Sequence, residues 1–353
     1  MAIRFFDMFS GIGGFRSGLE AIGGFECIGH CEIDEKANQA YTAMYDTKGE
    51  VYYADAREIK VEELPDFDLL CAGFPCQSFS VAGKRIGFKD DARGTLFFEI
   101  ARIVEYKRPS ILLLENVPGL LSHDKGRTYY EILARLTQLG YDIEWCVHNS
   151  KDFGVPQQRK RLFIVGFYSK GCAGKVFPLN PYDSKAIKQL VPGSQGYRIY
   201  SGDGIACTQC SCAGGLGAKT GLYLFVDMNA NPQLTNYARC ITARQNAGIS
   251  NRKGEHSGVL EIVEKPEKTK WIVAVKDKVG NIYQAVIRRL MPIECWRLQG
   301  FTDEQFYKAQ STGLKDSHLY KLAGNAVTVN VISEIGKKIK QLNEQKGIVR
   351  SDV

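Results

Sequence analysis

Along the first half of the chain, short apolar runs alternate with stretches in which apolar residues recur at helical spacing. An apolar run of about four to eight residues between turn residues predicts a buried strand, and apolar residues about three or four apart predict a helix. Strands alternating with helices indicate a doubly wound α/β fold on a mostly parallel sheet. We expect strands at residues 3–9, 25–33, 51–56, 68–73, 111–117, 141–149 and 161–168, and helices at residues 15–23, 34–45, 94–109 and 128–140.

The pattern changes near residue 170, where segments rich in glycine and serine replace the alternation. The next helical pattern is RLMPIECWRLQGF at residues 289–301, and a last amphipathic one follows at residues 330–345. We therefore expect a large α/β domain (1–170), a smaller domain of short strands and loops (171–286), and a hinge with a C-terminal helix that returns to the large domain (287–353).

Composition narrows the class of protein without deciding its function. The 353 residues are 44% hydrophobic and 24% charged, as in ordinary globular proteins, and the net charge of +7 permits a polyanionic partner without requiring one. The N-terminal segment lacks the features of a signal peptide, and no apolar run approaches the ~18 residues of a membrane span. The eleven cysteines are therefore expected to be reduced thiols in a cytoplasm.

The stretch CAGFPCQSFS, residues 71–80, places Cys76 between a proline and a glutamine just after a predicted strand. A cysteine is most often a small buried hydrophobic residue. Here the proline fixes the backbone before Cys76, and polar side chains follow it. This arrangement favours a presented, nucleophilic thiol over a packed one.

Three features at successive strand ends indicate a nucleoside pocket. The turn FSGIGGF follows the first strand and opens a helix, so its backbone N–H groups can approach a ligand closely. Arg16 stands where a dinucleotide fingerprint needs its third glycine, which disfavours a pyrophosphate cradle and hence a nicotinamide oxidoreductase. Glu32 stands where an acidic residue grips ribose hydroxyls, and Asp55 could accept a hydrogen bond from an adenine amino group. A single acid at a strand end is more often a helix cap, so the prediction rests on the combination.

A carboxylate and two guanidiniums extend this set. Glu115 ends the strand ILLLEN, and because parallel strands open on one edge we expect it beside Cys76. Arg159 and Arg161 stand two residues apart in QQRKR at the entry of another strand, so both side chains are expected on one face. The alternative for QQRKR is a solvated basic turn.

The chain resembles the DNA (cytosine-5)-methyltransferases of bacterial and phage restriction–modification systems. The resemblance rests on seven blocks in the family's order, covering residues 3–166 and 287–336: FDMFSGIGGF, CEID, GFPCQSFS, LLLENV, QQRKR, RRLMPIECWRLQGF and YKLAGNAVTVNVI. It implies the S-adenosylmethionine-dependent methyltransferase fold, with the family's target-recognition domain in the middle region.

The resemblance also implies an activity and a set of site residues. Such an enzyme transfers a methyl group from S-adenosylmethionine to C5 of a cytosine, flipped out of a specific double-stranded DNA sequence, and protects that DNA from a restriction endonuclease. Cys76 would add to C6 of the base, Glu115 would bind N3 and the amino group, and Arg161 would stabilise Glu115 and O2. Arg159 would support this group, and Asn116 would fix the loop that carries Cys76. The implied cofactor pocket comprises Phe9, Gly11, Gly13, Glu32, Asp55, Asn325 and Val327.

The implied DNA contacts divide between a mobile loop after Cys76 and the middle region. The family generally has one threonine-bearing recognition block, whereas this chain offers two, and we favour the loop at Thr242 because Arg244 and Gln245 suit guanine and adenine edges. The full set is Ser80, Lys84, Thr208, Thr242, Arg244 and Gln245.

A zinc site and two other functions are alternatives to this interpretation. The run C-x-x-C-x-C at residues 207–212 lacks a fourth ligand at finger spacing and is interpreted as ordinary thiols, not a zinc site. An RNA cytosine-5 methyltransferase is disfavoured by the long middle region, and an inactive DNA-binding protein by the intact Cys76, Glu115 and Arg161. We expect a monomer that binds double-stranded DNA, while any cognate restriction endonuclease acts separately.

Overall fold

A computed structural model of the chain describes residues 2–75, 96–168, 171–181, 238–241 and 290–349. In the middle region it also describes the backbone of short strands, whose bounds are given below.

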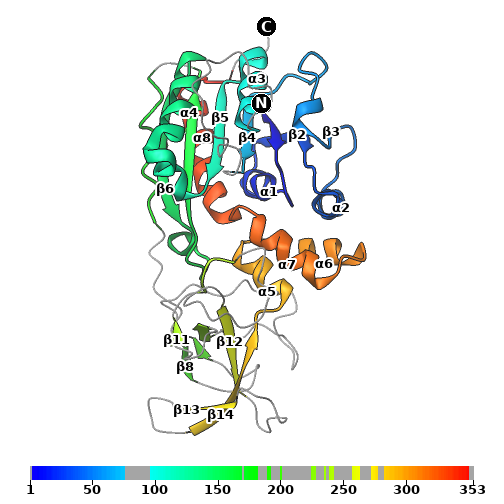
Figure 1. The fold of residues 1–353 in the computed structure, drawn as a ribbon, viewed down its shortest axis with the longest axis vertical. Helices are drawn as coiled ribbons and strands as arrows, with labels where there is room; N and C mark the ends of the chain where they lie inside the picture. Colours follow the sequence, from blue (N-terminus) through cyan, green and yellow to red (C-terminus); the bar gives the residue numbers. More distant parts are fainter. Residues whose placement is uncertain are drawn as a thin grey trace.

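The large domain is built on a seven-stranded sheet (Figure 1). Its strands are β1 (Ile3–Met8), β2 (Phe25–Cys31), β3 (Val51–Tyr53), β4 (Leu69–Gly73), β5 (Ile111–Asn116), β6 (Asp142–Asn149) and β7 (Lys160–Phe167). They lie in the order β3-β2-β1-β4-β5-β7-β6, and β1 to β5 are parallel while β7 is antiparallel to both of its neighbours. This confirms the doubly wound, mostly parallel sheet. The third strand is shorter than expected because Asp55 caps a 3-10 helix at Ala56–Glu58.

Helices cover both faces of this sheet, because alternate residues of a strand point to opposite faces. On one face, Phe6, Leu70 and Leu112 pack against α3 (Leu96–Lys107) and α4 (Arg127–Gln138). On the other, Phe5 and Leu113 pack against α1 (Gly14–Glu20) and α8 (Val329–Lys346). Each strand therefore contributes to two separate hydrophobic cores.

The C-terminal helix returns to the large domain and lies directly on α1. A Cβ on Gly18 would come within 2.6 Å of the Ile332 side chain, so the two helices approach as closely as glycine allows. Ser333 Oγ donates a hydrogen bond to Gly18 O at 2.9 Å. The glycine inside α1 is thus explained by packing, and the expected return of the chain is observed.

Arg16 occupies the space between α1 and α2 (Glu35–Met44). Its buried guanidinium pairs with Glu20 at 2.9 Å and Glu50 at 2.8 Å and lies over the Tyr45 ring at 4.6 Å. The residue that breaks the dinucleotide fingerprint therefore helps to hold α1 and α2 together.

Three further helices form a second layer beside α2: α5 (Pro292–Leu298), α6 (Asp303–Ser311) and α7 (Asp316–Asn325). They share a core with α2, centred on Trp296, whose Nε1 donates to Leu319 O at 2.9 Å. Figure 1 shows these helices below the large sheet, adjoining α2. The sequence pattern predicted α5 but not α6 or α7.

In the middle region, β8 (Gln189–Val191) pairs with β9 (Ile199–Tyr200), and five more strands form an antiparallel sheet in the order β11-β10-β12-β14-β13. These are β10 (Leu224–Asp227), β11 (Leu234–Thr235), β12 (Ser257–Ile262), β13 (Ile272–Lys276) and β14 (Ile282–Arg289). The five-stranded sheet lies beyond α5, away from the seven-stranded sheet (Figure 1). The expected boundaries at residues 170 and 286 stay predictions.

Two further facts concern only the described residues. Their cysteines are free thiols: Cys27, Cys31, Cys71, Cys146, Cys172, Cys240 and Cys295. Among their helices, none is both long and apolar enough to cross a membrane.

Candidate active site

Glu32 and Glu115, two of the residues expected at the site, lie at the edge of the sheet where β1, β2, β4 and β5 end. After β1, the chain builds outward through β2 and β3 and then returns to β4 on the other side of β1. Such a reversal of strand order opens a crevice at the carboxyl ends of the strands. Because β7 runs the opposite way, its first residues also lie at this edge.

Glu115 and Arg161 form an ion pair at this edge. Arg161 Nε lies 2.9 Å from Glu115 Oε1, and the two side chains are only 17% and 13% exposed, respectively. Burial raises the pKa of Glu115 above its ordinary value, and the charges of Arg161 and Arg159 oppose this shift. A partly buried carboxylate held by a guanidinium can accept hydrogen bonds and can retain a proton more readily than an exposed acid.

Arg159 lies close to this pair but has a different set of contacts. Its buried guanidinium donates to Ile241 O at 3.0 Å, Gly324 O at 3.1 Å and Ala326 O at 2.7 Å. Burial lowers the pKa of Arg159, and the neighbouring charge of Arg161 lowers it further. The alternative of a solvated basic turn is therefore wrong for QQRKR at this position. Arg159 instead joins the start of β7 to two distant segments of backbone, one at Ile241 and one at residues 324–326.

Asn116 connects β5 to the segment that leads towards Cys76. Its Nδ2 donates to Phe74 O at 2.8 Å, and its Oδ1 accepts from Val117 N at 2.8 Å. Phe74 stands two residues before Cys76. Cys76 itself lies outside the described residues, as do the expected DNA contacts Ser80, Lys84, Thr208, Thr242, Arg244 and Gln245 and the cysteines at 207, 210 and 212.

The glycine turn and Glu32 face each other across the ends of β1 and β2. Gly11 N donates to Glu32 Oε2 at 2.7 Å, and Asp34 N donates to Glu32 Oε1 at 2.8 Å. Burial raises the pKa of Glu32, partly offset by these backbone donors. Phe9 adopts a left-handed backbone (φ 55°), which is unusual for a residue with a side chain and marks a constrained turn.

Gly11 and Gly13, two of the three glycines in the turn, are glycine for different reasons. A Cβ on Gly11 would meet nothing within 4 Å, so that position borders open space. A Cβ on Gly13 would lie 2.6 Å from the Tyr45 ring, so that position is closed by protein. Both have positive φ, 56° and 77°. Gly11 can therefore line a ligand site, whereas Gly13 is required by packing.

The remaining expected cofactor residues surround the same edge. Both Asp55 oxygens accept hydrogen bonds from Arg57, which lowers the pKa of Asp55. Val327 is buried against Gly14, where an added Cβ would lie 2.5 Å from Val327 Cγ1. Asn325 is exposed between the two residues whose carbonyls Arg159 holds.

Two residues at this edge were not predicted. An added Cβ on Gly73 would lie 3.6 Å from Glu115 Oε2 and 3.6 Å from the Phe15 ring, so this glycine leaves space beside the carboxylate. Ile33 is 66% exposed directly after Glu32, which is unusual for a large apolar side chain. The apolar residue inside the acidic motif CEID was the available signal.

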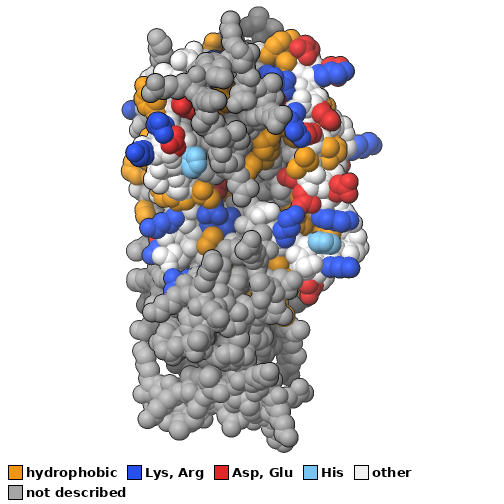
Figure 2. Space-filling view, in the orientation of Figure 1, with side chains coloured by type: hydrophobic (Ala, Val, Ile, Leu, Met, Phe, Trp, Pro, Cys, Tyr) orange, Lys and Arg blue, Asp and Glu red, His pale blue; other side chains and the backbone are white. Residues whose placement is uncertain are grey.

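Charged side chains of both signs lie on the face shown in Figure 2. Several lysine and arginine side chains lie at the level of α7, and aspartate and glutamate side chains lie beside and above them.

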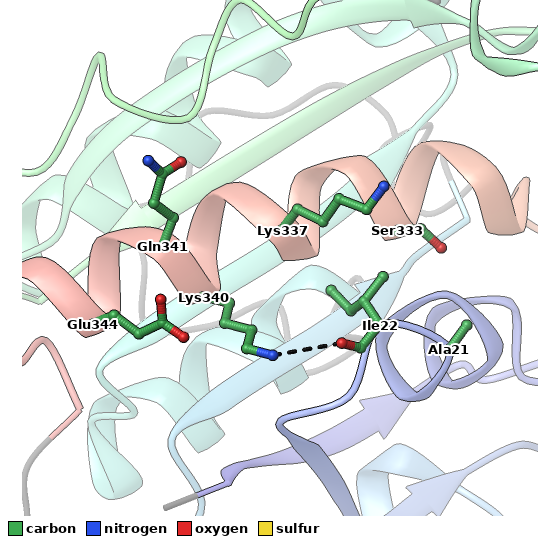
Figure 3. Close-up of a pocket in the computed structure, with 7 residues that line it drawn as sticks. All are labelled: Ala21, Ile22, Ser333, Lys337, Lys340, Gln341 and Glu344. Atoms are coloured by element: carbon green, nitrogen blue, oxygen red, sulfur yellow. Dashed lines mark hydrogen bonds between the residues drawn. The ribbon is translucent and has the colours of Figure 1, made fainter.

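A separate hollow lies between α1 and α8 (Figure 3). Its lysines contact protein groups: Lys337 pairs with Glu334 at 2.6 Å, and Lys340 Nζ donates to Gly23 O at 3.0 Å. It contains none of the expected site residues. Its lining is Ala21, Ile22, Ser333, Lys337, Lys340, Gln341 and Glu344.

Comparison with known proteins accounts for this arrangement. The family model described as C-5 cytosine-specific DNA methylase matches residues 3–341. The chain belongs to this family. It is therefore a DNA (cytosine-5)-methyltransferase, as the sequence blocks predicted.

Curated relatives cover the chain almost completely. The methyltransferase is 34% identical to the type II methyltransferase M.Bsp6I of Bacillus sp. (strain RFL6), over 94% of this chain and 97% of that one. It is 32% identical to M.HhaI of Haemophilus parahaemolyticus, over 96% and 94% of the two chains. It is also 30% identical to the orphan methyltransferase M.SPRI of Bacillus phage SPR, over 96% and 97%.

Solved structures show the same fold at lower identity. The S. pombe Dnmt2 methyltransferase has a TM-score of 0.63 at 18% identity, over 97% of this chain and 99% of that one. The Entamoeba histolytica methyltransferase EhMeth has a TM-score of 0.59 at 19% identity, over 98% and 99%. These likenesses concern the fold alone, and the methyltransferase has the S-adenosylmethionine-dependent methyltransferase fold.

Proposed function

We propose that this methyltransferase uses Cys76 to form a covalent bond with C6 of a cytosine flipped out of duplex DNA, and that it methylates C5 with S-adenosylmethionine as donor. The observation that carries the proposal is the Glu115–Arg161 ion pair, 2.9 Å long, at the sheet edge shared with Glu32. Asn116, the next residue after Glu115, bonds to the segment that ends at Cys76. A base placed at this edge would meet a thiol, a carboxylate and a guanidinium together.

The residues at this edge fit an adenosyl cofactor. Gly11 borders open space, and the carboxylate of Glu32 stands at the end of the neighbouring strand, where ribose hydroxyls are bound in related sheets. Ile33 offers an exposed apolar surface beside it. Phe9, Asp55, Asn325 and Val327 complete the proposed pocket, while Gly13 shapes it through packing. S-adenosylmethionine, when bound there, supplies an electrophilic methyl group.

The chemistry of cytosine explains why a thiol is needed. C5 of the ring is a poor nucleophile, and covalent addition at C6 divides a difficult reaction into easier steps. The Cys76 thiolate would form a bond to C6, and the electrons of the C5–C6 double bond would move so that C5 becomes nucleophilic while N3 takes up a proton. Once C5 has taken the methyl group, N3 would return its proton to Glu115. Loss of the C5 proton with elimination of the Cys76 thiolate would then restore the C5–C6 double bond.

Glu115 and Arg161 would assist this addition. Burial raises the pKa of Glu115, which suits a group that donates a proton or a strong hydrogen bond to N3 as C6 is attacked. Arg161 would hold the carboxyl group in position and stabilise charge on the pyrimidine O2. Arg159, whose guanidinium is bound to backbone carbonyls, would act by positioning this strand.

The substrate would be duplex DNA, from which the base must be flipped because its ring is unreachable inside the stack. The middle region would serve as the target-recognition domain, and the monomer would act separately from any endonuclease. We also propose that the modification protects DNA within a restriction–modification system. In support, the relatives include two bacterial methyltransferases named as type II.

A mechanism-based trap tests the covalent step. In DNA with 5-fluorocytosine at the target, fluorine replaces the C5 proton, so elimination is blocked. The wild type should form a denaturation-resistant complex when S-adenosylmethionine is present, and Cys76→Ala should form none. Cys146→Ala, which removes a half-buried thiol on β6, is the control and should trap like the wild type. Glu115→Gln should slow trapping by about 10²-fold or more. Equal trapping by Cys76→Ala would contradict the assignment.

A further inference from the structure

An ion pair connects α7 to the start of α2, although the two helices are far apart in the sequence. Lys321 Nζ on α7 lies 2.7 Å from Asp34 Oδ2, and the two residues are 287 positions apart. Both side chains are partly accessible, with Lys321 51% and Asp34 26% exposed. None of the expected site residues is a member of this pair.

Asp34 uses three of its atoms in three different contacts. Oδ2 accepts from Lys321, while Oδ1 accepts from Lys36 N at 2.9 Å and so caps α2. Its backbone N–H donates to Glu32 Oε1 at 2.8 Å. Partial burial acts to raise the pKa of Asp34, but hydrogen bonds from the Lys321 side chain and the Lys36 backbone N–H outweigh it and lower the pKa, as expected for a carboxylate held in its charged form. The orientation of the Asp34 peptide is thereby fixed from two sides.

The series of contacts continues into the glycine turn. Glu32 accepts from Asp34 N on one oxygen and from Gly11 N, at 2.7 Å, on the other. Since each oxygen has its own backbone donor, rotation of the Glu32 carboxyl group is restricted. A restrained carboxylate loses less conformational freedom when it binds a ligand.

The C-terminal end of α7 is also anchored at the site. The helix ends at Asn325, one turn after Lys321, and Arg159 holds the carbonyls on either side of that residue. The Lys321–Asp34 pair therefore links the Glu32 side of the proposed cofactor pocket to α7. This helix leads into Asn325 and Val327, which are proposed to line the same pocket.

We propose that Lys321 is a positioning residue for the cofactor: through Asp34 it holds the Glu32 carboxylate in the orientation that binds the ribose. This inference rests on the proposed use of S-adenosylmethionine. The competing explanation is that the pair only docks α7 on α2. A second link can separate the two explanations. Gln39 Nε2 on α2 donates at 2.8 Å to Thr312 O, the residue that caps the C-terminal end of α6 just before α7, and so it docks the same group of helices on α2 by another route.

Calorimetric titration of S-adenosylmethionine into the full-length enzyme, without DNA, tests the proposal. Lys321→Met should bind about threefold to fivefold more weakly, the upper range for a partly exposed pair, and Lys321→Arg should restore wild-type affinity. Gln39→Ala should bind like the wild type. So should Lys308→Met, which removes a 2.8 Å surface pair on α6. All four variants should unfold at the wild-type temperature.

Two further measurements sharpen the test. In methylation assays Lys321→Met should raise KM for S-adenosylmethionine and leave kcat unchanged, because only cofactor binding is affected. The difference from the wild type should shrink in 1 M salt, where the Debye length is only about 3 Å.

The outcomes separate the inference from the function on which it rests. A wild-type protein that does not bind S-adenosylmethionine would overturn the proposed cofactor. A wild-type protein that binds, together with equal binding by Lys321→Met, would overturn the positioning role alone. Equal weakening by Gln39→Ala would also overturn it, in favour of simple docking.

Discussion

Asp7 on β1 is completely buried, and neither of its carboxylate oxygens accepts a hydrogen bond from a described residue. Burial raises the pKa of Asp7 well above its ordinary value, although the charge of Arg16 opposes the shift. The folded chain therefore retains a proton that the unfolded chain loses as pH rises. Consequently the contribution of Asp7 to the free energy of unfolding is most favourable below the unfolded pKa and declines as pH increases.

Asp7→Asn should remove this dependence, because the amide is similar in shape and does not titrate. The variant should be more stable than the wild type near pH 8. The difference in free energy of unfolding between the variant and the wild type should fall by about 1.4 kcal/mol for each pH unit that the pH is lowered. This slope applies over the pH range in which Asp7 is protonated in the folded chain and ionised in the unfolded chain. Urea unfolding of both proteins between pH 8 and pH 5 measures this difference. A difference that stays constant with pH would mean that folded Asp7 is charged.

Single residues show what strand-end reasoning can predict. Glu32 and Glu115 lie at the predicted edge because parallel strands must end together, a rule that needs only the order of strands and helices. The same rule cannot tell which neighbours a side chain will contact. Asp55 is bound by Arg57, Arg159 by backbone carbonyls, and the space at Gly13 is occupied by Tyr45. Each of these follows from packing between segments that the pattern does not place.

At the scale of elements, the direction of β7 decides the site. In a fully parallel sheet, a strand that begins at Arg161 would place that residue at the edge opposite Glu115. The antiparallel pairing of β7 with β5 aligns Asn116 with Leu162 and brings Arg161 to the correct edge. The apolar pattern of RLFIVGFY predicts a buried strand in either direction, so the sequence pattern alone left this unresolved.

The two arginines at the start of β7 should therefore respond differently to the same substitution. Arg159→Lys should lower the free energy of unfolding by roughly 3 kcal/mol or more, because an ammonium group cannot reach three carbonyls that the guanidinium bonds. Arg161→Lys should keep most of the stability but reduce kcat by about 10²–10³-fold, because the group beside Glu115 is altered. Chemical unfolding and steady-state methylation of both variants measure the two effects. The assignments would be reversed if Arg159→Lys were stable and Arg161→Lys were unfolded.

At the scale of the whole molecule, the chain's apolar pattern predicted the large sheet and the return of α8. It did not predict α6 and α7, because their stability comes from the core they share with α2 around Trp296 and not from strong periodicity of their own. In the middle region the pattern predicted short strands, but pairing such as β12 with β14 depends on contacts distant in sequence. Long-range packing of this kind is what the sequence pattern lacked.

The choice of DNA target is expected to depend on the residues that follow a segment docked beside the active site. The segment Ala238–Ile241 is docked on the QQRKR turn: Ala238 N donates to Pro156 O at 2.8 Å, and Ile241 N donates to the Gln157 side chain at 3.0 Å. Ile241, the residue before Thr242, is therefore held beside the strand that carries Arg161. We accordingly retain the prediction that the residues after Thr242, and not those around Thr208, read the bases next to the cytosine.

Arg244→Ala or Gln245→Ala should each relax the methylated motif at one position, with a loss of about 1–3 kcal/mol of discrimination if the side chain makes a bidentate contact to a base edge. Bisulfite sequencing of DNA from cells that express each variant measures the motif directly. Thr208→Ala is the comparison, and it should leave the motif unaltered because that loop is expected not to read bases. If Thr208→Ala changes the motif while both other variants retain wild-type fidelity, the earlier loop reads the target.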